Sequence, residues 1–295
     1  MGNKTVIVIG AVNMDICGRP NKEPQLKDSN PGTVTFSPGG VGRNIAHNLC
    51  LLGLNVKFIA AIGDDMYGNS VYEDCMRIGI DMHLSRRMTG GRTSSYLYVT
   101  DENGDMFVGV CDTDISSSIT PEYLAAHLRE INEADAVVFD ANLTRETCAW
   151  IAENITAPLY ADPVSTAKAE RLRPAIKKLT AFKPNEFEAK ELTGEVTSLF
   201  AAEALLKEGV KRVFVSLGAD GIVAASDGEI IKLPCETTDI VNATGCGDAS
   251  MAAIVWAGVH GLGIAESASA AMKASAMCAA CDKTINPELC PELIS

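Results

Sequence analysis

The sequence is short of positive charge and of segments that could cross a membrane. Its 25 lysines and arginines stand against 38 aspartates and glutamates, so the formal net charge is −13. Binding along a nucleic-acid backbone needs clustered lysine and arginine, and this composition argues against a nucleic-acid partner. No stretch is apolar over the roughly 20 residues that a membrane helix needs. The first residues also lack a secretory pattern. We therefore expect a cytoplasmic protein without a membrane partner.

The ten cysteines do not form the pattern of a disulfide framework or of a zinc site. They are spread along the chain, mostly in apolar segments such as those around Cys50, Cys111, Cys148 and Cys278. This distribution is typical of buried thiols in a cytosolic protein. Cys278 and Cys281 have the Cys-x-x-Cys spacing, but they lie in a helical run of small residues, and no second pair follows. We interpret the pair as helix packing rather than as metal ligands.

The first strand is not followed by the glycine pattern of a dinucleotide-binding protein. Residues 5–9 form a β-branched run that predicts a buried strand, yet no Gly-x-Gly-x-x-Gly comes after it. Asn13 and Asp15 follow instead, at the spacing that places both side chains on one face of a strand. An amide and a carboxylate on one face could bind neighbouring hydroxyls such as those of a ribose. An ordinary polar strand end gives the same pattern.

Strand and helix patterns alternate along most of the chain. The predicted strands are residues 5–9, 57–62, 136–140, 159–162, 180–183 and 212–216, with helices that include residues 121–132, 145–154, 167–178 and 199–208. This alternation predicts a mostly parallel sheet with helices on both faces, in one domain over residues 1–295. Ligands bind at the carboxyl ends of the strands in such sheets.

Two segments interrupt the alternation. Residues 17–31 are polar and rich in turn formers, which predicts a loop or flap. Residues 93–110 predict an antiparallel hairpin with a turn at residues 101–105. We expect the regions of about 13–36 and 90–112 to form a lid, and the lid sheet is a candidate homodimer contact. An edge hairpin without such a role is the alternative.

Two glycine-containing segments are the strongest candidates for ligand binding. Gly39 and Gly40 let a ligand approach the backbone at the start of a predicted helix, in which Asn44 offers a donor and an acceptor. Residues 244–248 also open a helix, where free amides and the helix dipole favour an anion. Asp248 beside such a site is suited to take a proton from a hydroxyl that attacks a phosphoryl group. A capping role for Asp248 is the alternative.

A further motif lies at the start of the helix after residue 184. Asn185 and Glu188 share one face there, and the glutamate could hold magnesium through water near phosphates. A capping box gives the same spacing. The turn with Ser216, Gly218 and Gly221 follows another strand. Both motifs therefore belong to the expected ligand-binding edge.

Taken together, these motifs resemble the ribokinase-like (PfkB) family of carbohydrate and nucleoside kinases over essentially the whole chain. The resemblance rests on residues 39–44, continuing to residues 63–68, and on residues 244–248. It implies an α/β, three-layer fold with a mostly parallel sheet and a small β-sheet lid, and it implies ATP and Mg²⁺ as cofactors. Residues 28–32, 93–97 and 162–165 are most similar to the branch that phosphorylates pseudouridine at the ribose 5′-hydroxyl. One alternative is a kinase of this family that acts on another nucleoside, on ribose or on a sugar. The other is a non-catalytic nucleoside-binding protein.

The resemblance also implies a role for each motif. Asp248 would be the base, beside an anion hole of Gly245, Cys246 and Gly247. The substrate side would comprise Asn13, Asp15, Gly39, Gly40 and Asn44 for the ribose, and Ser29, Thr93 and Ser95 for the base. The nucleotide side would comprise Asn185, Ser216, Gly218 and Gly221, with Glu188 at the magnesium through water.

The sequence departs from the family pattern at three positions. Asn242 stands where many members have an aspartate that supports a monovalent-cation site, which leaves a K⁺ requirement open. Cys246 stands where alanine is usual, and we interpret it as a tolerated small residue rather than a redox-sensitive thiol. Asn142 stands where some sugar kinases have an acidic substrate ligand, so a neutral substrate contact is expected there.

Overall fold

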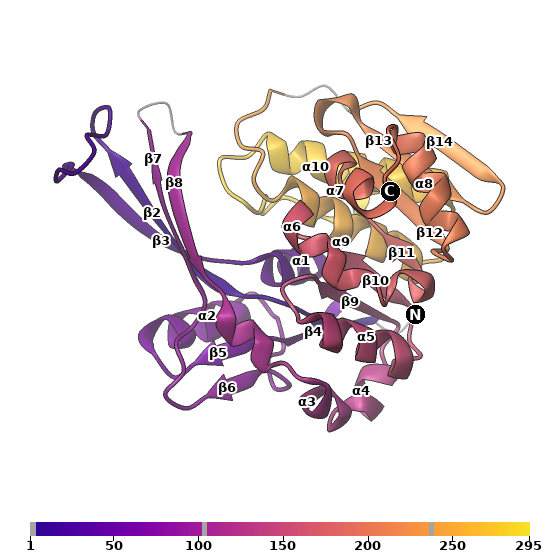
Figure 1. The fold of residues 1–295 in the computed structure, drawn as a ribbon, viewed down its shortest axis with the longest axis horizontal. Coiled ribbons are helices and arrows are strands. Elements are labelled where there is room, and N and C mark those ends of the chain that lie inside the picture. The colour runs from indigo at the N-terminus through magenta and orange to yellow at the C-terminus, as the bar shows by residue number, and fades with distance from the viewer. Residues whose placement is uncertain (1–3, 102–104, 236–238) are drawn as a thin grey trace.

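An eight-stranded sheet forms the middle of the molecule in the computed structural model, which describes residues 4–101, 105–235 and 239–295 (Figure 1). The strand order is β14-β13-β12-β11-β10-β9-β1-β4, parallel from β4 to β12 and antiparallel at β13 and β14. The bounds are β1 (Thr5–Ile9), β4 (Asn55–Ile59), β9 (Ala136–Asp140), β10 (Leu159–Asp162), β11 (Ala181–Phe182), β12 (Arg212–Ser216), β13 (Ile222–Ser226) and β14 (Glu229–Leu233). The predicted mostly parallel sheet is confirmed.

Helices cover both faces of this sheet because its central strands are apolar on both sides. In β1, Val6 and Val8 enter one core while Ile7 and Ile9 enter the other. The first core is covered by α1 (Val41–Leu51), α2 (Met66–Arg77), α9 (Cys246–Val259), α10 (Ile264–Ala279) and α11 (Pro291–Ile294). The second is covered by α3 (Pro121–Ala125), α4 (Leu128–Asn132), α5 (Arg145–Asn154), α6 (Thr166–Ala169), α7 (Glu186–Thr193) and α8 (Ser198–Lys207). The three-layer prediction is confirmed.

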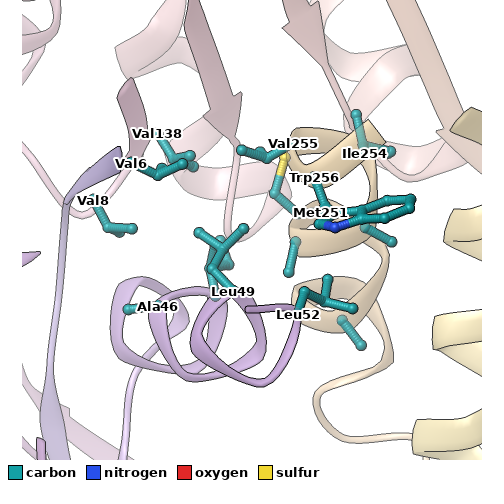
Figure 2. Packing of buried hydrophobic residues seen from close by; sticks show 14 of the residues in the cluster. Val6, Val8, Ala46, Leu49, Leu52, Val138, Met251, Ile254, Val255 and Trp256 are labelled. Atoms are coloured by element: carbon teal, nitrogen blue, oxygen red, sulfur yellow. The ribbon is translucent and has the colours of Figure 1, made fainter. Parts of the chain in front are cut away.

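The helices α1 and α9 pack side by side against the sheet (Figure 2). Leu49 of α1 lies close to Met251 and Val255 of α9, below Val6 and Val138 of the sheet, and all five are fully buried. This packing fixes the N-terminal ends of the two helices relative to each other. The two glycine segments of the sequence are therefore held together by an apolar core.

A four-stranded sheet, which we call the lid, projects from one side of the body (Figure 1). Its order is β3-β2-β7-β8, from β2 (Asn13–Pro20), β3 (Gly32–Gly39), β7 (Ser95–Thr100) and β8 (Met106–Asp112). The predicted hairpin is confirmed as β7 and β8, although residues 102–104 of its predicted turn lie outside the described residues. The predicted loop at residues 17–20 was wrong. These residues continue β2, because β3 and β7 pair with it on both sides and satisfy its backbone.

Three other predicted elements are divided in the structure. The strand at residues 57–62 breaks at Ala60 into β4 and β5 (Ala61–Gly63), and β5 pairs with β6 (Arg86–Met88). The helix at residues 121–132 is split into α3 and α4. The helix at residues 167–178 is replaced by α6 and the 3₁₀ turns η2 (Glu170–Leu172) and η3 (Ile176–Lys178), since Pro174 lacks the amide hydrogen of a helix interior. The remaining 3₁₀ turns are η1 (Asp114–Ser118) and η4 (Gly218–Asp220).

In the described part of the chain, no helix has the length and apolar character to cross a membrane. All ten cysteines carry free thiols. Cys148 and Cys278 are buried as expected, whereas Cys111 is exposed because its strand β8 is an outer strand of the lid.

Candidate active site

The carboxyl ends of neighbouring sheet strands bring four charged side chains together. Asp140 ends β9, Asp162 ends β10, Lys183 directly follows β11, and Asp248 lies in the first turn of α9. All four are at most 9% exposed. Burial of this many charges is costly unless they are paired or perform chemistry, so the cluster marks the candidate active site.

The start of α9 is shaped to receive an anion. Gly245 caps the helix with a φ of 88°, and a Cβ there would lie 2.2 Å from the Thr284 carbonyl oxygen, so only glycine fits. The helical ladder begins with the Ala249 amide, which donates to Gly245 over 2.9 Å. Of the preceding amides, that of Cys246 donates to the Ala243 carbonyl oxygen over 3.4 Å, whereas that of Gly247 belongs to the free end of the helix. A Cβ at Gly247 would meet the Lys183 Nζ at 3.5 Å, so a lysine ammonium faces the same space.

Asp248 is held beside this space by Asn44 of α1. Asn44 Nδ2 donates to Asp248 Oδ2 over 2.9 Å, across the packed pair of helices. Burial, together with the nearby Asp162 and Asp140 carboxylates, raises the pKa of Asp248 to about 8, against the opposing effects of the Asn44 hydrogen bond and Lys183. A carboxyl with its pKa in this range is suited to act as a general base near neutral pH.

Lys183 and Asp162 form a buried ion pair next to the anion space. Lys183 Nζ lies 3.6 Å from Asp162 Oδ2, and both side chains are less than 10% exposed. Neither residue was among the sequence candidates. Their only signal was position, because each stands at the carboxyl end of a strand. Asp140, also missed, accepts the Ala11 and Asn142 amides at 2.9 Å and thus fixes the turn after β1.

The predicted sugar-binding pair is formed as expected from the strand spacing. Asn13 Nδ2 donates to Asp15 Oδ1, so the two side chains lie on one face. They lie against glycines: a Cβ at Gly39 would be 2.1 Å from Asp15 Oδ2, and one at Gly40 would be 2.8 Å from Asn13 Oδ1. Burial raises the pKa of Asp15 to about 6, although the Asn13 hydrogen bond and the Arg43 charge lower it. The glycines thus make room for side chains as well as for a ligand.

The strand register decides which side chains of the lid share a face with Asp15. Asp15 pairs with Tyr96 of β7, and Cys17 pairs with Tyr98, so both tyrosines share its face. Their rings stack with centroids 5.3 Å apart. Ser95 pairs with Met14 and points to the opposite face. Tyr96 and Tyr98, which sequence reasoning missed, therefore replace Ser95 as candidates on the Asp15 side.

The other two base-binding candidates lie in different surroundings. Thr93 is buried, and its hydroxyl donates to Asp65 over 2.6 Å while it accepts the Gly63 amide at 3.0 Å. It therefore ties its loop to the start of α2. Ser29 is exposed in the connection between β2 and β3, next to Asp28, whose carboxylate accepts its amide hydrogen.

Asn185 and Glu188 form the capping box that the spacing allowed. Asn185 Oδ1 accepts the amides of Phe187 and Glu188 at 2.9 Å, and Glu188 Oε2 accepts the Asn185 amide at 2.8 Å. Burial and the Asp162 charge raise the pKa of Glu188, and Lys183 opposes the shift. The capping box therefore uses one carboxylate oxygen of Glu188, whose buried side chain is influenced by the charges of Asp162 and Lys183.

The nucleotide-side candidates follow β12. Ser216 ends this strand, and Gly218 and Gly221 bound the turn η4, both with positive φ. A Cβ at Gly221 would lie 2.0 Å from the Leu233 carbonyl oxygen, so packing against β14 is sufficient reason for glycine at this position. Gly218 meets nothing within 4 Å. The backbone at Gly218 is therefore more open to a ligand than the backbone at Gly221.

Asn142 and Asn242 both use their side-chain oxygen within the chain. Asn142 Oδ1 accepts a hydrogen bond from Lys168 Nζ at 2.6 Å, which places a lysine at the position expected to give a neutral contact. Asn242 Oδ1 accepts the Thr244 amide at 2.9 Å and so shapes the loop before α9.

Cys246, at the first position of α9, interacts with Cys278 of α10. The hydrogen bond from Cys278 lowers the pKa of the Cys246 thiol. Cys278 also lies within hydrogen-bond distance of the Thr244 and Thr284 carbonyl oxygens, at 3.5 and 3.3 Å. The Cys278 side chain therefore supports the loop that carries the anion space.

A magnesium ion at this site would need water molecules and phosphate oxygens to complete its coordination. Among the described residues, no three histidine, cysteine, aspartate or glutamate side chains are grouped as a ready-made metal site. Magnesium usually keeps several waters and binds through one or two carboxylates plus phosphate oxygens. Glu188, buried beside the anion space, suits that mode of binding.

Comparisons with known proteins identify the family of this chain. Residues 3–289 match the family described as pfkB family carbohydrate kinase. The pseudouridine kinase of Escherichia coli strain K12 is 38% identical over 96% of this chain and 93% of its own, and the sugar kinase YeiI of the same strain is 33% identical over 96% and 80%. The ribokinase of Thermotoga maritima has the same fold, with a TM-score of 0.88, 22% identity and coverage of 99% and 98%. The chain therefore belongs to the pfkB family of carbohydrate kinases and is a phosphotransferase with an alcohol acceptor.

Proposed function

We propose that this kinase transfers the γ-phosphoryl group of magnesium-bound ATP to the ribose 5′-hydroxyl of pseudouridine. The observation that carries the nucleoside assignment is the stacked pair Tyr96 and Tyr98 on the same lid face as Asp15. A ribose diol held by Asn13 and Asp15 would direct its base along β2 and β7 toward these rings. Aromatic side chains bind flat bases by stacking. The 38% identity to a pseudouridine kinase supports this base over others.

The chemistry of the transfer follows from the cluster at α9. Asp248 accepts the proton of the 5′-hydroxyl, whose oxygen forms the new bond to phosphorus as the bond to the ADP oxygen breaks. The free amides of the helix start, including that of Gly247, donate to the oxygens of the moving phosphoryl group. The Lys183 ammonium, which faces Gly247, supplies a positive charge to the same phosphoryl group. Magnesium, held through water by Glu188, would neutralise phosphate charge when bound.

On the nucleotide side we propose the surface formed by Asn185, Ser216 and Gly218, with Gly221 shaping the turn. The lid would close over the ribose and exclude water from the phosphoryl group. Asn242 keeps a carbonyl lone pair near the loop before α9, so potassium belongs among the additions to be tested.

The deciding experiment compares acceptors under identical conditions. The purified protein is incubated with magnesium-ATP and pseudouridine, uridine or ribose, with and without K⁺, and ADP release and product mass are followed. The proposal expects a 5′-monophosphate from pseudouridine in clear preference to the others. Turnover with ribose or uridine instead would overturn the substrate assignment but not the chemistry. No turnover with any acceptor would favour another sugar, consistent with the similarity to YeiI, or a non-catalytic nucleoside-binding protein.

We also propose that the outer face of the lid joins two copies of this chain. The strand register places apolar side chains together on the face opposite Asp15; these are Ile16, Val34, Phe36, Leu97, Val99, Val108 and Val110. Several are strongly exposed, including Val110 at 66% and Val34 at 60%. A second lid is a self-complementary partner for this face, and two-fold dimers are the commonest oligomers.

A further inference from the structure

Arg43 is a buried arginine, and burying its charge costs free energy unless its contacts with neighbouring residues compensate for that cost. It lies in the first turns of α1, directly before Asn44, and is only 6% exposed. Its Nη2 donates to Asp74 Oδ2 over 2.6 Å, and its Nη1 donates to Asn44 Oδ1 over 3.3 Å. Its Nε is buried without a hydrogen-bond partner among the described residues. An apolar side chain would be cheaper to bury at such a place.

The contact with Asn44 decides which way that amide points. A guanidinium can only donate hydrogen bonds, so the atom that faces it is the amide oxygen. The Asn44 Nδ2 is then left to face Asp248, to which it donates over 2.9 Å. With the amide reversed, Oδ1 would face the carboxylate, and two acceptors would meet. An N–H donor favours the ionised carboxylate, whereas an opposed oxygen favours the protonated form.

The other groups around Asp248 do not fix this orientation. Asp162 on β10 and Asp140 on β9 raise its pKa, and Lys183 after β11 lowers it. Cys278 of α10 is close enough for the Asp248 charge to raise the pKa of its thiol. None of these has a hydrogen bond to Asn44 in the described structure. The direct contacts of the Asn44 side chain are with Arg43 and Asp248.

We propose that Arg43 is a positioning residue that locks the Asn44 amide with its nitrogen toward Asp248 and so keeps this carboxyl available as a base. The proposal rests on the proposed function only in the assignment of Asp248. Asp74 anchors the guanidinium from α2 and is itself also paired with the exposed Arg77. The order of contacts is therefore Asp74, Arg43, Asn44 and Asp248.

The test begins with the substrate-free protein, so that it does not depend on the acceptor. Aspartate is labelled with ¹³C at the carboxyl carbon, the Asp248 signal is assigned with Asp248→Asn, and its titration is followed by NMR in the wild type and in Arg43→Met. We expect the pKa of Asp248 to rise by about one to two units, since a hydrogen bond to a charged group contributes about 1.5–3 kcal/mol. Arg43→Lys, which can still donate to Oδ1, should restore most of the wild-type value.

A second measurement separates positioning from packing. With whichever acceptor is turned over, Arg43→Met should lower kcat and move the acid limb of its pH profile upward, with little change in KM. In the Asn44→Leu background the same substitution should have no further effect on kcat. Arg43→Met combined with Asp74→Asn removes the carboxylate charge that would otherwise keep only the exposed Arg77 as its partner, and it should regain stability, measured by thermal unfolding, without regaining kcat.

Two outcomes would overturn the proposal. One is an unchanged Asp248 pKa in folded Arg43→Met. The other is an equal loss of kcat from Arg43→Met in the wild-type and Asn44→Leu backgrounds. If the pKa rises as expected while pseudouridine is not phosphorylated, the substrate assignment fails and the role of Arg43 stands.

Discussion

The end of the central sheet and the lid present opposite solutions to ligand binding. At the sheet, Asp140, Asp162, Lys183 and Asp248 are between 1% and 9% exposed, and each is placed by a strand or helix end in the apolar core. On the lid, large apolar side chains such as Val110 remain 66% exposed. The sheet end keeps its charged side chains buried, whereas the lid leaves apolar side chains exposed, which we expect a substrate or a second copy of the chain to cover.

From this difference we expect the sheet end to govern the phosphoryl-transfer step and the lid to govern substrate binding and assembly. Burial sets the pKa of Asp248, and a substitution at the sheet should therefore change kcat. By contrast, we expect a substitution at the lid tyrosines or on the outer face of the lid to change KM or assembly. The predictions below probe this division, beginning with the largest expected effect.

The strongest test of the sheet side is Asp248→Asn. It removes the proposed base without changing its size, and we expect kcat to fall by about 10²–10⁴-fold. Burial raises the pKa of Asp248 to about 8, so the native state holds this proton between the unfolded value of 3.8 and about 8 and loses stability as pH rises through that range. The variant should therefore unfold at a higher temperature than the wild type, with the greatest difference above pH 8.

Thermal unfolding of the two proteins at pH 5 and pH 8.5 measures the second effect. A stability gain with near-normal turnover would show that Asp248 is buried for another reason than proton transfer. A loss of both turnover and stability would indicate a structural role for its hydrogen bond with Asn44.

The next effect concerns Lys183, whose ammonium faces Gly247 and pairs with Asp162. Lys183→Met should lower kcat by roughly 10²-fold, because one charge that stabilises the moving phosphoryl group is lost. It also leaves Asp162 buried without its partner. Lys183→Met with Asp162→Asn is the matched control, which should recover thermal stability but not kcat. Full recovery of kcat in the double variant would contradict a catalytic role for the lysine.

The sheet side was largely predictable from sequence, and the reason is local. Residues 6–9 and 213–215 are continuous apolar runs, and glycines with a following aspartate at residues 245–248 indicate a helix start whatever the rest of the chain does. Lys183 and Asp162 were missed because no local pattern distinguishes them. They become partners only when β10 and β11 lie next to each other in the sheet.

The lid was predicted in outline but not in register. Residues 17–20 contain turn formers, and only pairing with β3 and β7 makes them strand. The sequence prediction named Ser95 for the base, but the register places Ser95 on the face opposite Asp15 and the neighbouring Tyr96 on the same face as Asp15. Which residues of two neighbouring strands share a face depends on the register between segments that are distant in the chain. A single sequence does not reveal that register.

A smaller effect is expected at the aromatic pair of the lid. Tyr98→Leu keeps an apolar side chain but removes the ring, and base stacking contributes about 1–3 kcal/mol. We expect KM for pseudouridine to rise at least about fivefold with kcat nearly unchanged. Ribose, which has no base, is the matched control substrate, and its KM should not move if it is turned over at all. Equal changes for ribose and pseudouridine would place Tyr98 outside the base site.

The smallest effect on chemistry is expected from the outer face of the lid. Leu97 is 46% exposed there, in the middle of the face, and is paired with Ile16 and Val110. Leu97→Glu would set two carboxylates against each other across a two-fold axis, so the dimer should dissociate while each monomer keeps its fold. Light scattering coupled to size exclusion measures the mass, and Thr35→Glu on the opposite face of the lid is the control for added charge. Because the sheet-end charges lie outside this face, kcat should stay within about twofold of the wild type. A monomeric wild type, or a dimer that survives the change, would leave the apolar face without the partner proposed for it.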